Sequence, residues 1–198
     1  EAEARKTFSE EEVIELTGSP EEVERVLKAR TEKEDAPAST WLALARLYQY
    51  TERVDPAKDA LRKAMAKAEV NSRDWRQAWQ QLFSIELGTD AYDKAADLIA
   101  QMKKADPKAT EIMFYDALLA LSQKKPDEAV TQLRNVVQAN KTLSQAHFIL
   151  GQVLARQRKW DEAVVEMTKT LELRPQLIPG RLLLGRIYLS QGNFTAVL

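Results

Sequence analysis

The sequence predicts an all-α fold in which one pair of helices is repeated along the chain, and three observations support this. Four residues whose side chains contain a ring stand 34 positions apart, and a small residue follows each of them three positions later. These pairs are Tyr92 and Ala95, Pro126 and Ala129, Trp160 and Ala163, and Phe194 and Val197. Apolar residues recur at helical spacing between these landmarks, and short polar turns separate the apolar segments. Such a period indicates stacked copies of one helical hairpin.

Each copy, here called a unit, is expected to contain a first helix, a polar turn and a second helix. Counted from the clearest copy, the units begin near Ala38, Arg76, Thr110, Ser144 and Ile178, with a weaker one near Ala4. The second helices open with capping signals, because Ser19 offers an acceptor hydroxyl and Pro20 suits a first helical position. Asp55 and Pro56 form a similar start. Small residues such as Gly151, Ala163 and Ala129 are predicted to let neighbouring helix backbones approach closely.

One irregularity interrupts the period, because Trp41 and Trp79 occupy matching positions but stand 38 residues apart. The four extra residues lie between Tyr50 and Trp75. The sequence leaves open how they divide between the turn at residues 52–55 and the polar stretch at residues 71–74.

The segment from Ala146 to Pro175 contains Leu150, Gly151, Trp160 and Ala163 in an order that resembles the tetratricopeptide repeat family. The resemblance covers about five and a half repeats. It implies an α-α superhelix, that is, a right-handed solenoid of antiparallel helix pairs. Residues 38–198 then form the repeat array, with its last repeat truncated, and residues 1–37 form an atypical N-terminal helical repeat or cap.

Composition excludes several function classes. The chain has 198 residues, 29 basic and 30 acidic side chains, and a net charge of -1, so no global charge attracts nucleic acid. It has no cysteine, which rules out disulfides and thiolate chemistry. No apolar run approaches the roughly 18 to 20 residues that a membrane span needs. These features fit a soluble protein of either the cytoplasm or a bacterial periplasm.

No catalytic pattern is present, so we expect no enzyme activity, no cofactor and no metal site. The single histidine, His147, stands at a repeat position that otherwise holds large residues, and a packing role is favoured because no acid is evident beside it. The acidic pairs Asp127-Glu128 and Asp161-Glu162 open second helices, where carboxylates stabilise the helix end. Neither a nucleotide-binding glycine motif nor a nucleophile elbow occurs.

The family resemblance implies that first helices line a concave groove whose exposed positions contact peptide ligands. When the family's groove positions are carried to this chain by their place within each repeat, the candidate partner-binding residues are Leu42, Arg46, Gln49, Tyr50, Gln80, Ser84, Phe114, Tyr115, Leu118, Phe148, Gln152, Arg156 and Arg186. The Lys and Asn residues by which some relatives hold a carboxylate terminus are missing. An aromatic and aliphatic strip around Phe114, Tyr115, Leu118 and Phe148 instead suits an apolar segment or amphipathic helix. The alternative, that some of these rings belong to the repeat core, stays open.

The favoured function is a non-catalytic scaffold that binds a protein or peptide partner in the groove. The alternative is the recognition arm of a larger machine, such as a bacterial envelope or polysaccharide-export system, or of an enzyme whose catalytic domain lies elsewhere. The chain lacks an initial Met and ends inside a predicted second helix, so a fragment or processed product is expected. An apolar end near Leu182, Leu183 and Phe194 would then be exposed, and self-association through terminal repeats is a third possibility.

Overall fold

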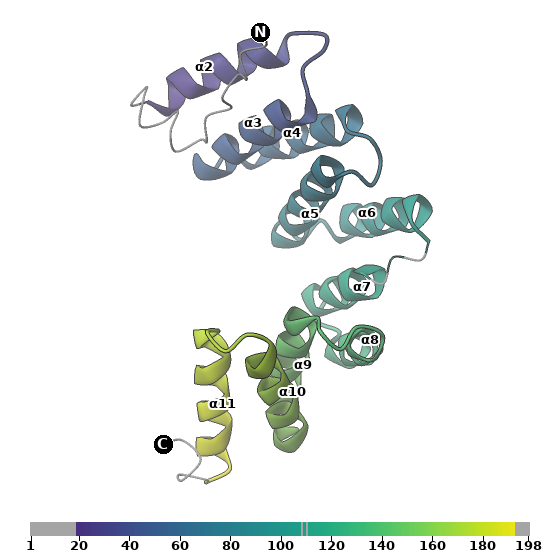
Figure 1. Cartoon of the computed structure of the whole chain (residues 1–198), viewed down its shortest axis with the longest axis vertical. Coiled ribbons are helices and arrows are strands. Elements are labelled where there is room, and N and C mark those ends of the chain that lie inside the picture. The colour runs from purple at the N-terminus through teal and green to yellow at the C-terminus, as the bar shows by residue number, and fades with distance from the viewer. Residues whose placement is uncertain (1–18, 108, 110, 193–198) are drawn as a thin grey trace, which may run out of the picture. The chain divides into compact units, whose positions relative to one another are not determined.

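The computed structural model describes residues 19–107, 109 and 111–192, and within these ranges the chain forms ten helices and no strand (Figure 1). The prediction of an all-α fold is therefore confirmed. The helices are α2 (Pro20–Thr31), α3 (Ala38–Tyr50), α4 (Val54–Lys67), α5 (Arg73–Gly88), α6 (Tyr92–Ala105), α7 (Glu111–Ser122), α8 (Pro126–Ala139), α9 (Ser144–Arg156), α10 (Trp160–Leu173) and α11 (Ile178–Ser190). The unit predicted near Ala4, and the landmarks Phe194 and Val197, lie outside the described residues.

The described helices group into two compact bodies, one formed by α2 to α5 and the other by α6 to α11. In the first body α3 packs against α2, α4 and α5, and α4 packs against α5. In the second body each helix from α6 to α11 packs against the next one, and α9 also contacts α11. The predicted boundary at residues 37 and 38 concerns the type of repeat and stays a prediction. No described helix is both long enough and apolar enough to cross a membrane.

A three-residue turn joins the helices of each pair, and its middle residue has a positive φ. The φ angles are 57° at Glu52, 55° at Asp90, 61° at Lys124 and 59° at Arg158, while Gly192, one period later, has 71°. In the turn after α9, Lys159 N–H donates to Leu154 O at 2.9 Å and Arg158 N–H donates to Ala155 O at 3.0 Å. This pairing satisfies helix-end carbonyls and closes the helix in a Schellman motif. The sequence did not reveal the turn, because charged residues occupy four of its left-handed positions.

Three of the four extra residues lengthen the N-terminal end of α5, and the fourth lies in the segment that connects α4 to α5. The turn between α3 and α4 has the usual three residues, so it holds none of them. In contrast, α5 has 16 residues whereas α9 has 13, and its additional turn is at the N-terminal end. Ser72 caps this turn, since its Oγ accepts from Trp75 N–H at 3.3 Å. Of the two segments left open by the sequence, residues 71–74 therefore hold the insertion.

Two of the predicted helix starts need correction. The Ser19 side chain does not cap α2, because its hydroxyl donates to Glu21 Oε2 at 2.6 Å instead. Asp55 is not a cap either, since α4 already begins at Val54 and Asp55 lies in its first turn. A carboxylate within the first turn still interacts favourably with the partial positive charge at the helix end.

Within each body, small residues lie where the two helices of a pair pack together, as predicted. Ala57 on α4, Ala129 on α8 and Ala163 on α10 are all fully buried. A Cβ added to Gly151 would lie 2.3 Å from Met167 Cε and 3.4 Å from the carbonyl oxygen of Ala163. The α9 and α10 backbones thus approach closely where the sequence placed its smallest residues.

A buried ion pair joins α4 and α5. Lys58 Nζ lies 2.8 Å from Glu86 Oε2 and donates to Thr89 Oγ1 at 2.9 Å, while Arg62 Nη2 lies 2.9 Å from Glu86 Oε1. Two periods later, in the second body, the matching positions hold Val130 on α8 and Leu154 on α9, both buried. The ion pair therefore occupies positions that hold buried apolar side chains elsewhere in the array.

Candidate functional site

The thirteen residues predicted to bind a partner all lie on first helices, namely α3 and α5 in the first body and α7, α9 and α11 in the second. Seven of them are exposed: Arg46, Gln49, Tyr50, Gln80, Ser84, Arg156 and Arg186. Leu118, Phe148 and Gln152 are half-buried. The structure does not test whether any of them contacts a partner.

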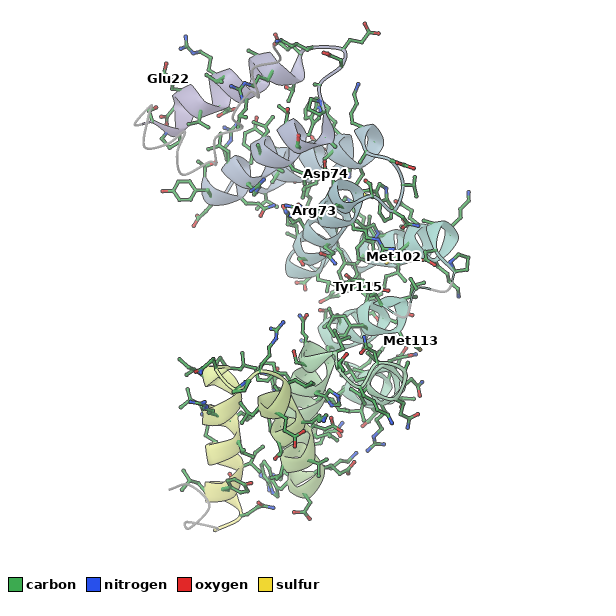
Figure 2. The ribbon with its side chains drawn as sticks, in the orientation of Figure 1. Glu22, Arg73, Asp74, Met102, Met113 and Tyr115 are labelled. Carbon is green, nitrogen blue, oxygen red and sulfur yellow. The ribbon has the colours of Figure 1, made fainter. Side chains whose placement is uncertain are left out.

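The exposure expected for the other three residues is wrong. Leu42 is 2% exposed, Phe114 7% and Tyr115 8%, so these side chains pack among the helices. Figure 2 labels Tyr115 on α7. The rings of Phe114 and Tyr115 meet edge to face, with their centroids 5.8 Å apart. Edge-to-face pairing of this kind stabilises a core. The alternative that some rings belong to the repeat core holds for these two, and the apolar strip shrinks to the half-buried Leu118 and Phe148.

In the first body, the first helices α3 and α5 form a shallow, uncharged hollow. It has a volume of about 310 Å³ and is lined by Gln49, Gln80, Gln81, Ser84 and Ile85. The Gln49 amide donates to Gln81 Oε1 at 3.0 Å. The hollow therefore presents amide groups that can both donate and accept hydrogen bonds.

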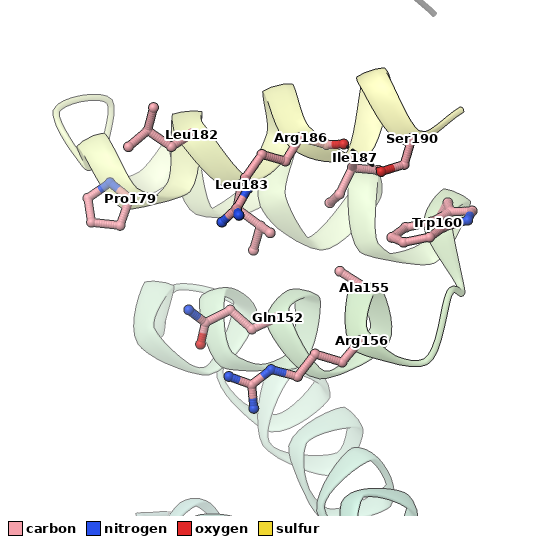
Figure 3. Close-up of a pocket in the computed structure, with 10 residues that line it drawn as sticks. All are labelled: Gln152, Ala155, Arg156, Trp160, Pro179, Leu182, Leu183, Arg186, Ile187 and Ser190. Atoms are coloured by element: carbon pink, nitrogen blue, oxygen red, sulfur yellow. Dashed lines mark hydrogen bonds between the residues drawn. The ribbon is translucent and has the colours of Figure 1, made fainter. Parts of the chain in front are cut away.

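In the second body, a larger pocket of about 500 Å³ opens between α9 and α11 (Figure 3). Its lining includes Gln152 and Arg156 from α9, Trp160 from the start of α10, and Leu182, Leu183 and Arg186 from α11. Figure 3 shows Leu183 directed from α11 toward α9. The pocket thus combines apolar walls with two guanidinium groups and one amide.

The family resemblance implies groove positions for Gln152, Arg156 and Arg186, and all three border this one pocket. The contribution of Trp160 was missed, because this residue was interpreted as a landmark of the repeat. Nothing in a single sequence separates a tryptophan that stabilises a turn from one that also borders a pocket.

His147 is buried, as the packing role required, but an acid does lie beside it. Its Nδ1 is 2.6 Å from Glu166 Oε2, and its Nε2 is 3.2 Å from Lys141 O. The expectation of no neighbouring acid was wrong because Glu166 lies on the next helix, where sequence spacing does not reveal contacts. Among the described residues no group of three or more His, Asp or Glu side chains is arranged to hold a metal ion.

Two models of known protein families match parts of this chain. The family model described as tetratricopeptide repeat matches residues 38–66, and the model of anaphase-promoting complex, cyclosome, subunit 3 matches residues 88–170. The chain is a tetratricopeptide-repeat protein. No curated protein matches it by sequence.

Solved structures of other tetratricopeptide-repeat proteins share the fold. The solved structure of pilF from Pseudomonas aeruginosa has a TM-score of 0.66 at 17% identity, and the match covers 93% of this chain and 82% of that one. MamA from Desulfovibrio magneticus RS-1 has a TM-score of 0.58 at 15% identity, covering 83% and 90%. YrrB, titled as a TPR protein with an unusual peptide-binding site, has a TM-score of 0.51 at 19% identity, covering 86% of each chain.

These comparisons support the class of α-α superhelices and the general role of the family. Tetratricopeptide-repeat proteins are in general scaffolds that bind protein or peptide partners, and they are generally non-catalytic. At these identities the solved structures show the fold alone.

Proposed function

We propose that this chain is a non-catalytic scaffold that binds a peptide or helix of a partner protein on its first helices. The observation that carries the proposal is the pocket between α9 and α11, where apolar side chains and convergent polar groups line one concavity. Partner-binding sites commonly have this composition, an apolar centre with a few polar groups that orient the ligand.

Rigid secondary structure supports this role. Gln152 and Arg156 lie on one face of α9, and Leu182 and Arg186 lie one helical turn apart on α11. Because both helices are packed against α10, the backbone positions that carry these side chains are fixed before a ligand arrives. Such preorganisation reduces the entropy lost on binding. A scaffold and the recognition arm of a larger machine would use the same surface.

A peptide library displayed on phage provides the test. Peptides selected on the full chain should bind the variant Leu182→Ser/Leu183→Ser at least about tenfold more weakly, because truncating buried apolar anchors at an interface costs more than about 1 kcal/mol each. The matched control is Val165→Ser, since Val165 is an apolar side chain, 65% exposed, on the second helix α10.

Isothermal titration calorimetry measures the affinity of the selected peptides for the wild type and for each variant, and circular dichroism confirms that each variant is folded. Equal affinity for the wild type and the Leu182→Ser/Leu183→Ser variant would contradict the proposal. So would a loss of binding of the same size in Val165→Ser.

A further inference from the structure

We propose that the pocket between α9 and α11 selects a partner segment in which a carboxylate stands next to an apolar side chain, with Arg156 and Arg186 binding the carboxylate. This inference rests on the proposed function and names the chemistry of its ligand. Three independent features of the second body support it: the distribution of charge, the pairing of the acidic groups and the composition of the pocket walls.

Charge is separated between first and second helices in this part of the chain. Helices α9 and α11 together contain three arginines and no Asp or Glu, whereas α10 contains four acidic residues and a single lysine. The net charge of the chain hides this separation, because it is only -1. A pocket bordered by α9 and α11 therefore has a positive potential that attracts anionic groups.

The acidic residues of α10 already have partners. Glu162 pairs with Arg134, Glu166 with His147 and Glu172 with Lys169, while Asp161 accepts from the Gln191 amide. Arg156 and Arg186, in contrast, are exposed and form no ion pair within the described part of the chain. Their guanidinium groups are available for a ligand.

The two arginines stand over apolar walls. Leu182, on α11, is 64% exposed, and Leu183 and the ring of Trp160 border the same pocket (Figure 3). Low-dielectric walls strengthen a charge-assisted hydrogen bond, and a planar guanidinium can hold a carboxylate with two parallel bonds. A ligand that satisfied both parts of the site would combine an aliphatic or aromatic side chain with Asp or Glu.

A protein segment fits these features better than a nucleic acid does. Binding of nucleic acid needs many phosphate contacts from a broad basic surface. The pocket offers two guanidinium groups, and its leucines would meet the polar backbone of a nucleic acid without benefit. An acidic, apolar peptide uses both.

Fluorescence anisotropy with two labelled peptides tests the inference on the full chain. One 12-residue probe alternates Leu and Glu, and its matched partner replaces every Glu by Gln. The Glu probe should bind at least about tenfold more tightly than the Gln probe, and added salt should reduce this difference. Arg156→Glu and Arg186→Glu should each weaken the Glu probe by about tenfold and leave the Gln probe unchanged. Arg181→Glu is the matched control, because Arg181 is exposed on α11 but does not line the pocket.

A charge exchange provides the decisive comparison. A probe that alternates Leu and Lys should bind Arg156→Glu/Arg186→Glu more tightly than it binds the wild type. Equal binding of the Glu and Gln probes would overturn the carboxylate preference while leaving the groove proposal intact, since that proposal depends on Leu182 and Leu183. An equal loss in Arg181→Glu, binding of neither probe, or competition by a poly-uridine strand as strong as by the Glu peptide would also overturn it.

Discussion

Arg158 has a φ of 59°, a conformation in which the Cβ of an L-residue crowds its own backbone. The same position holds Lys124 one period earlier, Asp90 two periods earlier and Gly192 one period later. Glycine reaches this conformation without a steric penalty, so the chain has its most suitable residue at just one of these turns. The others are held in place by the hydrogen bonds of the Schellman motif.

Replacing Arg158 by Gly should therefore stabilise the second body by about 0.5 to 1 kcal/mol. Relief of the left-handed penalty, about 1 to 2 kcal/mol, exceeds the extra entropy that glycine gives to the unfolded chain. Urea unfolding measures the difference. Lys159→Gly is the matched control, since the neighbouring Lys159 has a φ of -83° and gains nothing from glycine. Stabilisation of equal size by both variants would show that turn strain is not the cause.

Asp116 is the second residue at odds with its place in the repeat. One period before and after it stand Leu82 and Leu150, which are both buried. The pKa of the Asp116 carboxyl is raised, chiefly because burial disfavours its charged form; Glu128 raises it further and Lys103 opposes the shift. The folded chain thus binds this proton more tightly than the unfolded chain does. The contribution of Asp116 to stability is most favourable at low pH and is lost as the pH rises through the raised pKa.

Asp116→Asn should accordingly raise the melting temperature at pH 7, because it removes a charge from a half-buried site. The gain should shrink as the pH falls through the raised pKa and be lost below the ordinary carboxyl pKa of 3.8, where the side chain is protonated in the folded and the unfolded wild type alike. Calorimetry at several pH values measures the trend. Asp97→Asn, at an exposed position of α6, is the comparison. A gain that stays constant across the pH range would rule out this explanation.

At the scale of elements, α4 and α5 are joined by a charged contact at positions that hold the buried apolar residues Val130 and Leu154 two periods later. Glu86 is 1% exposed, and Lys58 and Arg62 both bind its carboxylate. A buried ion pair contributes little net stability, because desolvation offsets the attraction, yet loss of one partner leaves a charge uncompensated. The contact therefore has a large effect when broken and a small one when replaced as a whole.

Glu86→Ala should destabilise the first body by about 3 to 5 kcal/mol, because it strands the Lys58 ammonium in a buried site. The double variant Lys58→Val/Glu86→Leu copies Val130 and Leu154 and should restore most of this loss. Chemical unfolding followed by circular dichroism compares them. Glu172→Ala breaks an exposed pair with Lys169 and should change stability by less than about 0.5 kcal/mol. A double variant no more stable than Glu86→Ala would contradict the idea that the apolar contact is equivalent.

The starts of three first helices, at Ala38, Ser144 and Ile178, were predicted to the residue, and those of α5 and α7 to within three positions. These helix starts were predictable because the spacing of apolar residues and the positions of small residues can be recognised within a single repeat. The predicted cap at Ser19 was wrong, because the Ser19 hydroxyl donates a hydrogen bond to the nearby Glu21 carboxylate and does not bind the helix backbone. The contacts of Glu86 and Glu166 join side chains on separate helices, and single-sequence spacing does not reveal such pairs.

At the scale of the whole molecule, the family and the fold class followed from the 34-residue period, whereas the site followed only in part. The position of a residue within the 34-residue period identifies the helix that carries it and, roughly, the face of that helix on which it lies. It does not tell whether a ring such as Phe114 or Tyr115 stays on the surface or turns into the core, because burial depends on the neighbouring helix. The polar candidates Gln152, Arg156 and Arg186 were more secure, since charged and amide groups seldom become buried.

Repeat arrays are stabilised by contacts between neighbouring repeats, so a local change should have a local effect. Glu86→Ala should accelerate amide hydrogen exchange in α4 and α5 and leave α9 and α10 unchanged. Met167→Ala should do the reverse, because Met167 is fully buried on α10 and its truncation costs about 2 to 5 kcal/mol. Hydrogen exchange under native conditions, followed by mass spectrometry, resolves the peptides of each helix. If either variant accelerated exchange equally in all four helices, the chain would unfold as one cooperative block, and stability could not be assigned to individual neighbouring contacts.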